Sequence, residues 1–190
     1  EWTREVIRLR KGVFIFRDSF RAKVRGTFLL GINWMPKGVG SRKGDGHLFM
    51  SRGGRLLVNV VGDGWQPGST APDLTERKVS YRTIRNLKPG QTATIYTVMQ
   101  AGRAGAEAFL PVAAQGEETL TIGKEPSATV LHFDPSLKEG WSASLLIETP
   151  SALGVYDGAP AKGDERRSFV LKTDAVDGPV LAYLEKQRTQ

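Results

Sequence analysis

The chain has 190 residues, which is long enough to bury a sizeable core. It has no cysteine, so a disulfide framework, a zinc–thiolate site and a thiol nucleophile are excluded. Hydrophobic residues make up 39% and charged residues 25%, as in globular proteins, and no apolar run approaches the roughly 18 residues of a membrane span. The formal net charge is +7, and residues 1–55 alone carry 13 basic and 4 acidic side chains. This basic third can attract a polyanion such as an acidic polysaccharide or a nucleic acid, although a solvated sheet face explains the same charges.

The first elements predicted are strands, because apolar residues recur with a period of two. Residues 5–10 and 13–16 are strand-like runs around Lys11-Gly12, which predicts a hairpin with Gly12 at a positive φ. From residue 20 to residue 34 the even positions are mainly apolar, which predicts one half-buried strand. Its wet face begins with Arg21, Lys23 and Arg25, and alternate residues of a strand would form a cationic row about 13 Å long.

The rest of the chain continues the pattern of short strands between turns that contain Gly, Pro or Asp. The predicted strands are residues 47–51, 56–61, 78–85, 92–100, 118–122, 128–133, 142–148, 154–156 and 168–173. Gly105 and Pro111 break residues 102–116 into a loop, residues 134–140 fit one helical turn, and the tail from Pro179 fits either a last strand or a helix.

About a dozen short strands with little helix predict an all-β fold, specifically an antiparallel β-sandwich. We interpret residues 1–190 as a single domain with a soft boundary near residues 123–126. The chain begins at Glu1 and shows no signal peptide, so we expect either a removed leader or a fragment of a larger protein.

The sequence offers no catalytic motif. It has no Gly-x-Ser-x-Gly elbow and no Walker loop, and its two histidines, His47 and His132, show no metal-ligand spacing. We therefore expect no catalytic residue, no metal site and no cofactor. A complete β-elimination enzyme that uses Tyr81 or Tyr96 with an arginine is an open but less favoured hypothesis.

Two irregular stretches, residues 36–46 and 62–76, are rich in Gly, Pro, Ser and Asp and are candidates for binding loops. The glycines of residues 38–44, with Arg42 and Lys43, can hold an anion through backbone amides and charge. Trp65 lies in a Gly- and Pro-rich segment, and we predict that it is exposed and contacts a ligand. Trp34 continues the apolar register and is predicted to be a core residue.

Four stretches carry a resemblance to a known family: residues 2–20, 28–34, 55–61 and 87–99. The first is a charged strand that turns into a hydrophobic strand ending in Asp-Ser-Phe, and the others look like the strands that follow it. Together they resemble the C-terminal β-sandwich region of heparinase II/III-like polysaccharide lyases, over roughly residues 1–125. The resemblance implies a supporting half of a larger protein, because such lyases place most of their catalytic machinery in or against a helical toroid.

We expect a non-catalytic β-sandwich domain of a polysaccharide-lyase-like bacterial protein, secreted or periplasmic, that packs against a catalytic domain of the same parent chain and helps to bound a polysaccharide groove. The alternative is a stand-alone carbohydrate-binding or adhesion module. The expected ligand is an acidic polysaccharide. We expect no nucleic-acid partner, because the sequence shows neither a recognition helix nor an aromatic RNA-binding motif.

Overall fold

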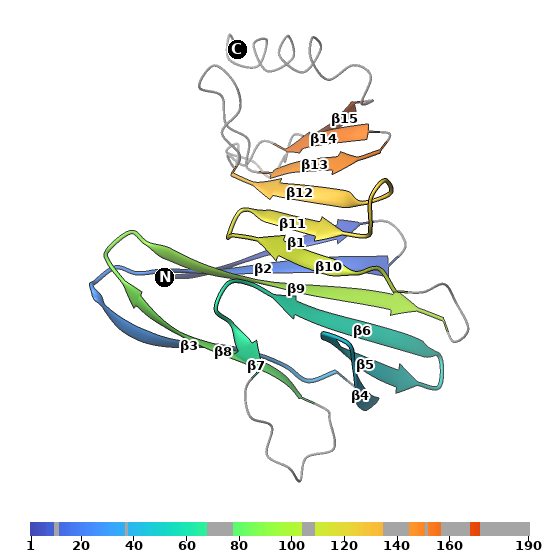
Figure 1. Cartoon of the computed structure of the whole chain (residues 1–190), viewed down its shortest axis with the longest axis horizontal. Coiled ribbons are helices and arrows are strands. Elements are labelled where there is room, and N and C mark those ends of the chain that lie inside the picture. The colour runs from blue at the N-terminus through green and yellow to red at the C-terminus, as the bar shows by residue number, and fades with distance from the viewer. Residues whose placement is uncertain are drawn as a thin grey trace, which may run out of the picture. The chain divides into compact units, whose positions relative to one another are not determined.

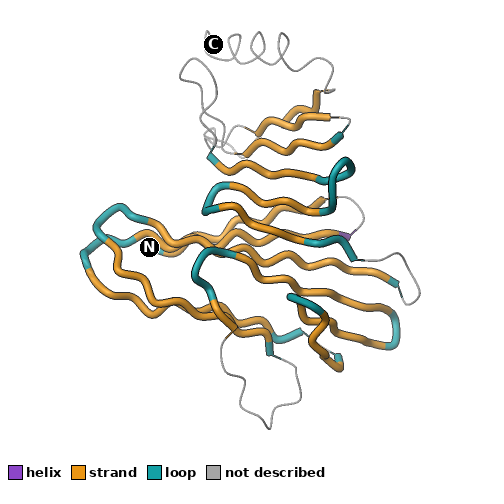
Figure 2. The backbone as a smooth tube through the Cα atoms, viewed as in Figure 1, coloured by secondary structure: helices purple, strands orange, loops and turns teal. Residues whose placement is uncertain are grey.

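The structure is a computed structural model that describes residues 1–9, 12–36, 38–67, 78–103, 109–134, 145–150, 152–156 and 168–171. The chain divides into two compact units, Glu1–Glu117 and Glu118–Gln190, so the soft boundary expected near residues 123–126 falls inside the second unit. Within the described ranges the regular structure consists of β-strands without an α-helix, which confirms the predicted all-β class (Figure 2). Those ranges accordingly contain no long apolar helix of the kind that spans a membrane.

The first unit contains two antiparallel sheets, which we name sheet A and sheet B (Figure 1). Sheet A has the strand order β1 (Trp2–Leu9), β2 (Val13–Arg21), β9 (Thr92–Gly102), β6 (Gly54–Val61), β5 (Gly46–Ser51) and β4 (Val39–Lys43). Sheet B has the order β3 (Gly26–Trp34), β8 (Val79–Leu87) and β7 (Gln66–Pro67). The strands that the sequence predicts at residues 47–51, 56–61, 78–85 and 92–100 are therefore confirmed.

The hydrophobic core of the first unit lies between sheets A and B. Sheet B contributes Leu30 and Ile32 from β3 and Val79 from β8, and sheet A contributes Val58 from β6 and Ile95 from β9. These side chains alternate with solvent-facing or outward-facing residues along each strand, as the period of two requires. The two faces therefore bury each other as in a β-sandwich.

The predicted continuous strand over residues 20–34 is wrong, because it is two strands in two different sheets. Strand β2 ends at Arg21, a bend follows, and β3 begins at Gly26 in sheet B. Ala22 is buried in the bend and Val24 is exposed, so apolar side chains continue at even positions although the extended backbone does not. Apolar alternation alone did not reveal where the chain changes sheets.

Strand β4 corrects the interpretation of residues 36–46 as an irregular loop. Residues 39–43 pair with β5 in register, with Lys43 opposite Gly46, and a two-residue turn connects the strands. Gly44 has φ +58° at the first position of that turn, where a hairpin favours glycine. The segment is thus an edge hairpin of sheet A.

Residues 102–116, predicted as a loop, contain strand β10 (Val112–Gln115), which lies beside β6. Residues 109–117, which are the last part of this segment together with Glu117, are hydrogen-bonded to Tyr96 and Gln100 on the face of β9 that points away from sheet B. Gln100 Nε2 donates to the Leu110 carbonyl, and the Leu110 amide donates back to Gln100 Oε1, both at 2.8 Å. We name residues 109–117 the cap segment.

The second unit contains β11 (Thr119–Ile122), β12 (Thr129–Phe133), β13 (Leu145–Thr149), β14 (Ala152–Tyr156) and β15 (Ser168–Leu171), which pair antiparallel in chain order. Leu120, Leu131 and Ile147 lie opposite one another across β11, β12 and β13 and are buried. Asp134 is described, but the remainder of the predicted helical turn at residues 134–140, Trp141 and the tail from Pro179 lie outside the described residues.

Candidate functional site

Trp65 does not lie on the surface, so the prediction that it is an exposed ligand contact is wrong. Its side chain is only 9% exposed and belongs to the core between the sheets. The indole Nε1 donates a 2.9 Å hydrogen bond to the Thr94 carbonyl. At Gly62 a Cβ would lie 3.1 Å from the Trp65 ring and from the Thr94 oxygen, so glycine leaves the space that the indole needs. The Trp65 ring, although it lies in a polar turn, therefore packs in the core between the two sheets.

Arg42 and Lys43, predicted to hold an anion, are exposed and lie on β4, at the edge of sheet A. Arg42 pairs across the strands with His47, whose ring meets Tyr81 edge to face at a centroid distance of 6.3 Å. Burial raises the pKa of the Tyr81 hydroxyl, and the nearby positive charge of Arg42 opposes that shift. This pKa direction keeps Tyr81 protonated, so it does not prepare the hydroxyl as a general base.

The cations predicted on the wet face of one strand lie at one end of the first unit instead. Arg21 is the last residue of β2, and Lys23 and Arg25 lie in the exposed bend before β3. Strands β9, β6 and β5 lie between β2 and β4 in sheet A, so at about 4.8 Å per strand the lateral separation of β2 from β4 is about 19 Å. These cations and the Arg42–Lys43 pair are therefore two separate surfaces rather than one.

A pocket of about 510 Å³ occupies this end of the unit. Its lining residues are Arg25, Gly26, Thr27, Asn86, Leu87, Lys88 and Gln91, so none of the described residues that line it is acidic. Thr27 Oγ1 donates a hydrogen bond to Asn86 Oδ1, which orients two of the polar walls. We name this the end pocket. It combines two cations with amide and hydroxyl groups, and the sequence predicted only Arg25 among them.

Backbone hydrogen bonds fix the end pocket by joining two distant turns. The bend after β2 and the turn between β8 and β9 are linked at Ala22, whose amide donates to the Gln91 carbonyl at 2.9 Å. The Gly90 amide donates to the Ala22 carbonyl at 2.8 Å. Within the second turn, the Lys88 amide donates to Gln91 Oε1 at 2.8 Å. Figure 1 shows both connections at the same end of the sandwich, near the N-terminus.

Trp2 is an exposed tryptophan that the sequence did not single out as a binding residue. Its side chain is 43% exposed, and its Nε1 donates to Asp18 Oδ1 at 3.0 Å. Asp18 is buried and also accepts two hydrogen bonds from Arg4, at 2.7 Å from Nε and 3.0 Å from Nη2. The Arg4 guanidinium lies 4.7 Å from the centroid of Trp34. One buried carboxylate therefore sets the orientation of an exposed indole and of a stacked arginine.

Tyr96 and Arg17 are the tyrosine and arginine that the structure brings together. They lie opposite each other on β9 and β2, and the Tyr96 hydroxyl donates to the Glu117 carbonyl of the cap segment. Burial raises the pKa of Tyr96 to about 12, although Arg17 opposes the shift. The Tyr96 side chain is fully buried, so it holds the cap segment through Glu117 and gives a substrate no access.

The described residues contain no group of three or more His, Asp or Glu side chains suited to a metal ion. His47 lies on β5 in the first unit, and His132 lies on β12 in the second unit, 3.7 Å from Glu148. Comparison with protein-family models, with curated proteins and with solved structures gives no match to this chain.

Proposed function

We propose that this chain is a non-catalytic β-sandwich domain of an exported, polysaccharide-lyase-like bacterial protein, and that its end pocket binds an acidic polysaccharide. The single observation that carries the binding role is the composition of the end pocket: Arg25 and Lys88 share its walls with Thr27, Asn86 and Gln91, and no described lining residue is acidic. Those five side chains are exposed, so a polymer can reach them.

The chemistry of these walls fits a sugar acid. Amide and hydroxyl side chains both donate and accept hydrogen bonds, which matches the hydroxyl groups of a pyranose. The guanidinium of Arg25 and the ammonium of Lys88 supply the charge that a uronate carboxylate requires. A neutral glycan would form hydrogen bonds with the amide and hydroxyl side chains but would gain no affinity from the two cations.

The non-catalytic part of the proposal is supported by the two tyrosines considered as bases. β-Elimination needs a base whose proton affinity suits the operating pH and which reaches the substrate proton. Burial raises the pKa values of both Tyr81 and Tyr96, and neither side chain is exposed. Both are better explained as packing residues.

A second observation favours the supporting role in a larger protein. Leu29 on β3 and Ile84 on β8 lie directly opposite each other on the outer face of sheet B and are 69% and 70% exposed. Large exposed apolar side chains that adjoin each other are typical of a contact surface. Under this proposal the face packs against the catalytic domain of the same parent chain.

The binding role is tested by calorimetric titration of the chain with oligogalacturonate and with a neutral oligosaccharide of equal length. We expect affinity for the acidic ligand only, and a loss of about tenfold or more, equivalent to about 1.4 kcal/mol, in R25Q/K88Q. The affinity should fall as salt screens the charges. K43Q is the matched control, because it removes an exposed cation from the distant β4 edge. Equal affinity in the wild type and R25Q/K88Q contradicts the proposal.

The supporting role is tested in the intact parent protein. L29D/I84D should lower the melting temperature of the parent more than that of the isolated chain, because only the parent buries this face. Equal shifts in the two proteins contradict the packing role, and they leave the titration result of the end pocket unaffected.

A further inference from the structure

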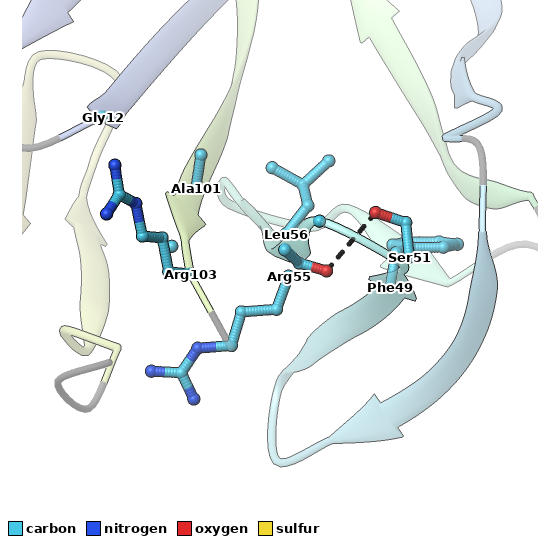
Figure 3. A pocket seen from close by; sticks show the side chains of 10 residues that line it. Gly12, Phe49, Ser51, Arg55, Leu56, Ala101 and Arg103 are labelled. Atoms are coloured by element: carbon cyan, nitrogen blue, oxygen red, sulfur yellow. Dashed lines mark hydrogen bonds between the residues drawn. The ribbon is translucent and has the colours of Figure 1, made fainter. Parts of the chain in front are cut away.

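A second hollow, of about 630 Å³, lies in the first unit where β6 begins and β9 ends (Figure 3). Its lining residues are Gly12, Phe49, Ser51, Gly53, Gly54, Arg55, Leu56, Ala101, Gly102 and Arg103. We name it the glycine pocket. None of these residues belongs to the end pocket, and the sequence patterns singled out none of them as a binding residue.

Close backbone contacts explain two of the glycines in this lining. A Cβ at Gly54 would lie 2.9 Å from the Gly102 carbonyl oxygen, where it would clash with the backbone. Gly12 has φ +74°, a conformation that other residues rarely adopt, and its Cβ would lie 3.1 Å from the Ala101 carbonyl oxygen. Neighbouring backbone therefore fills the space that a side chain would take at both positions, which is why glycine is needed there.

Two arginines supply the charge of the glycine pocket. Arg55 comes from β6, and its guanidinium carbon lies 4.5 Å from the centroid of the Phe109 ring, which holds the group by a cation–π contact. Arg103 follows β9 directly and is exposed. No acidic residue is among the described residues that line the hollow. The described lining thus carries positive charge from two arginines.

The remaining side chains of the lining are apolar except for that of Ser51, whose hydroxyl donates to the Gly54 carbonyl. Phe49, Leu56 and Ala101 line the hollow beside the two arginines, and Figure 3 shows these side chains around it. An arginine fork matches the two oxygens of a carboxylate, and the apolar wall can contact the carbon body that bears it. Inorganic phosphate would satisfy the arginines but would make no use of that wall.

We infer that the glycine pocket is a binding site for an organic carboxylate, held by Arg55 and Arg103 with its carbon body against Leu56 and Ala101. The site shares no lining residue with the end pocket. The carboxylate can belong to a free sugar acid or to a residue of a polymer, and the two sources share this recognition chemistry.

The test is a ¹H–¹⁵N NMR titration of the whole chain that follows the amides of Gly53, Gly54 and Gly102. The probes are galacturonate, galactose, inorganic phosphate and oligogalacturonate. We expect shifts with galacturonate, none with galactose and weaker binding of phosphate. If the shifts give a higher affinity for oligogalacturonate than for the monomer, the source of the carboxylate is a polymer residue. An equal or lower affinity identifies the free acid as the source.

The variants R103Q and R55Q/R103Q should weaken galacturonate binding about tenfold or more, equivalent to about 1.4 kcal/mol. R103Q removes an exposed side chain, so it tests the site even where loss of the Arg55–Phe109 contact destabilises the double variant. R25Q/K88Q should retain the glycine amide shifts, which separates this site from the end pocket. Absent shifts in the wild type, unchanged affinity in R103Q, or phosphate binding as tight as galacturonate binding would overturn the inference.

Discussion

The two faces of strand β9 are both buried, but different chemistry covers each of them. On the face toward sheet B, Ala93 and Ile95 join the apolar core, and Thr97 accepts a 3.0 Å hydrogen bond from the Trp34 indole. On the opposite face, Tyr96 and Gln100 are buried beneath the cap segment, to which both are hydrogen-bonded. One strand therefore separates an apolar layer from a largely polar one.

The difference shows which interactions hold each layer. Apolar burial is non-directional, so the core contributes stability wherever shapes fit. Hydrogen bonds contribute less net energy, but a buried donor or acceptor without a partner is costly, so they specify where the cap segment lies. We expect substitutions on the inner face to change global stability most, and those on the outer face to act mainly on the cap segment.

The largest expected effect is that of Ile95→Ala on the inner face. Ile95 is 0% exposed, and replacing a fully buried isoleucine leaves a cavity that typically costs about 2–5 kcal/mol. Urea unfolding followed by tryptophan fluorescence measures the change in the free energy of unfolding. Ile84→Ala, the same substitution at an exposed position of β8, should change it by about 0.5 kcal/mol or less. Similar losses in both variants would show that the inner face is not the main source of stability.

The sequence predicts the fold class and most strands because alternation and glycine-containing turns are local signals. It misplaces the passage from β2 to β3, since Ala22 and Val24 keep the apolar alternation through a bend. It also assigns Trp65 to the surface, because its polar neighbours hide a contact with Thr94 that is 29 residues away. Both errors concern which distant part of the chain a segment packs against, and a local pattern does not contain that information.

The residues of the end pocket also fall into those that a local pattern predicts and those that depend on distant contacts. Arg25 was identified from its local charge pattern and lines the pocket, whereas Lys88 and Gln91 were not, because they reach it only through the hydrogen bonds between Ala22 and the turn that precedes β9. The glycine pocket had a weaker signal still. Gly12 and Gly54 lie where the sequence predicts turns, and their closeness to the carbonyls of Ala101 and Gly102 is not a local feature of the sequence.

The smaller effect is that of Tyr96→Phe on the outer face, and it depends on pH. At neutral pH the variant loses one hydrogen bond to the Glu117 carbonyl, worth about 1 kcal/mol net. Burial raises the folded-state pKa of Tyr96 from 10.0 to about 12, so the unfolded chain releases the proton first as pH rises. The stability that protonated Tyr96 contributes is therefore fully present below pH 10 and is lost between pH 10 and pH 12.

The measurement is the difference in the free energy of unfolding between the wild type and Tyr96→Phe from pH 8 to pH 12. Tyr81 and the other titrating groups are present in both proteins, so their contributions largely cancel in the difference. We expect the advantage of the wild type to hold constant up to about pH 10 and then to shrink. Relative to the wild type, hydrogen exchange in the variant should accelerate more at residues 109–117 than in the core of sheet B, because Tyr96 holds the cap segment. Parallel stability curves and uniform exchange would contradict the distinction between the two faces of β9.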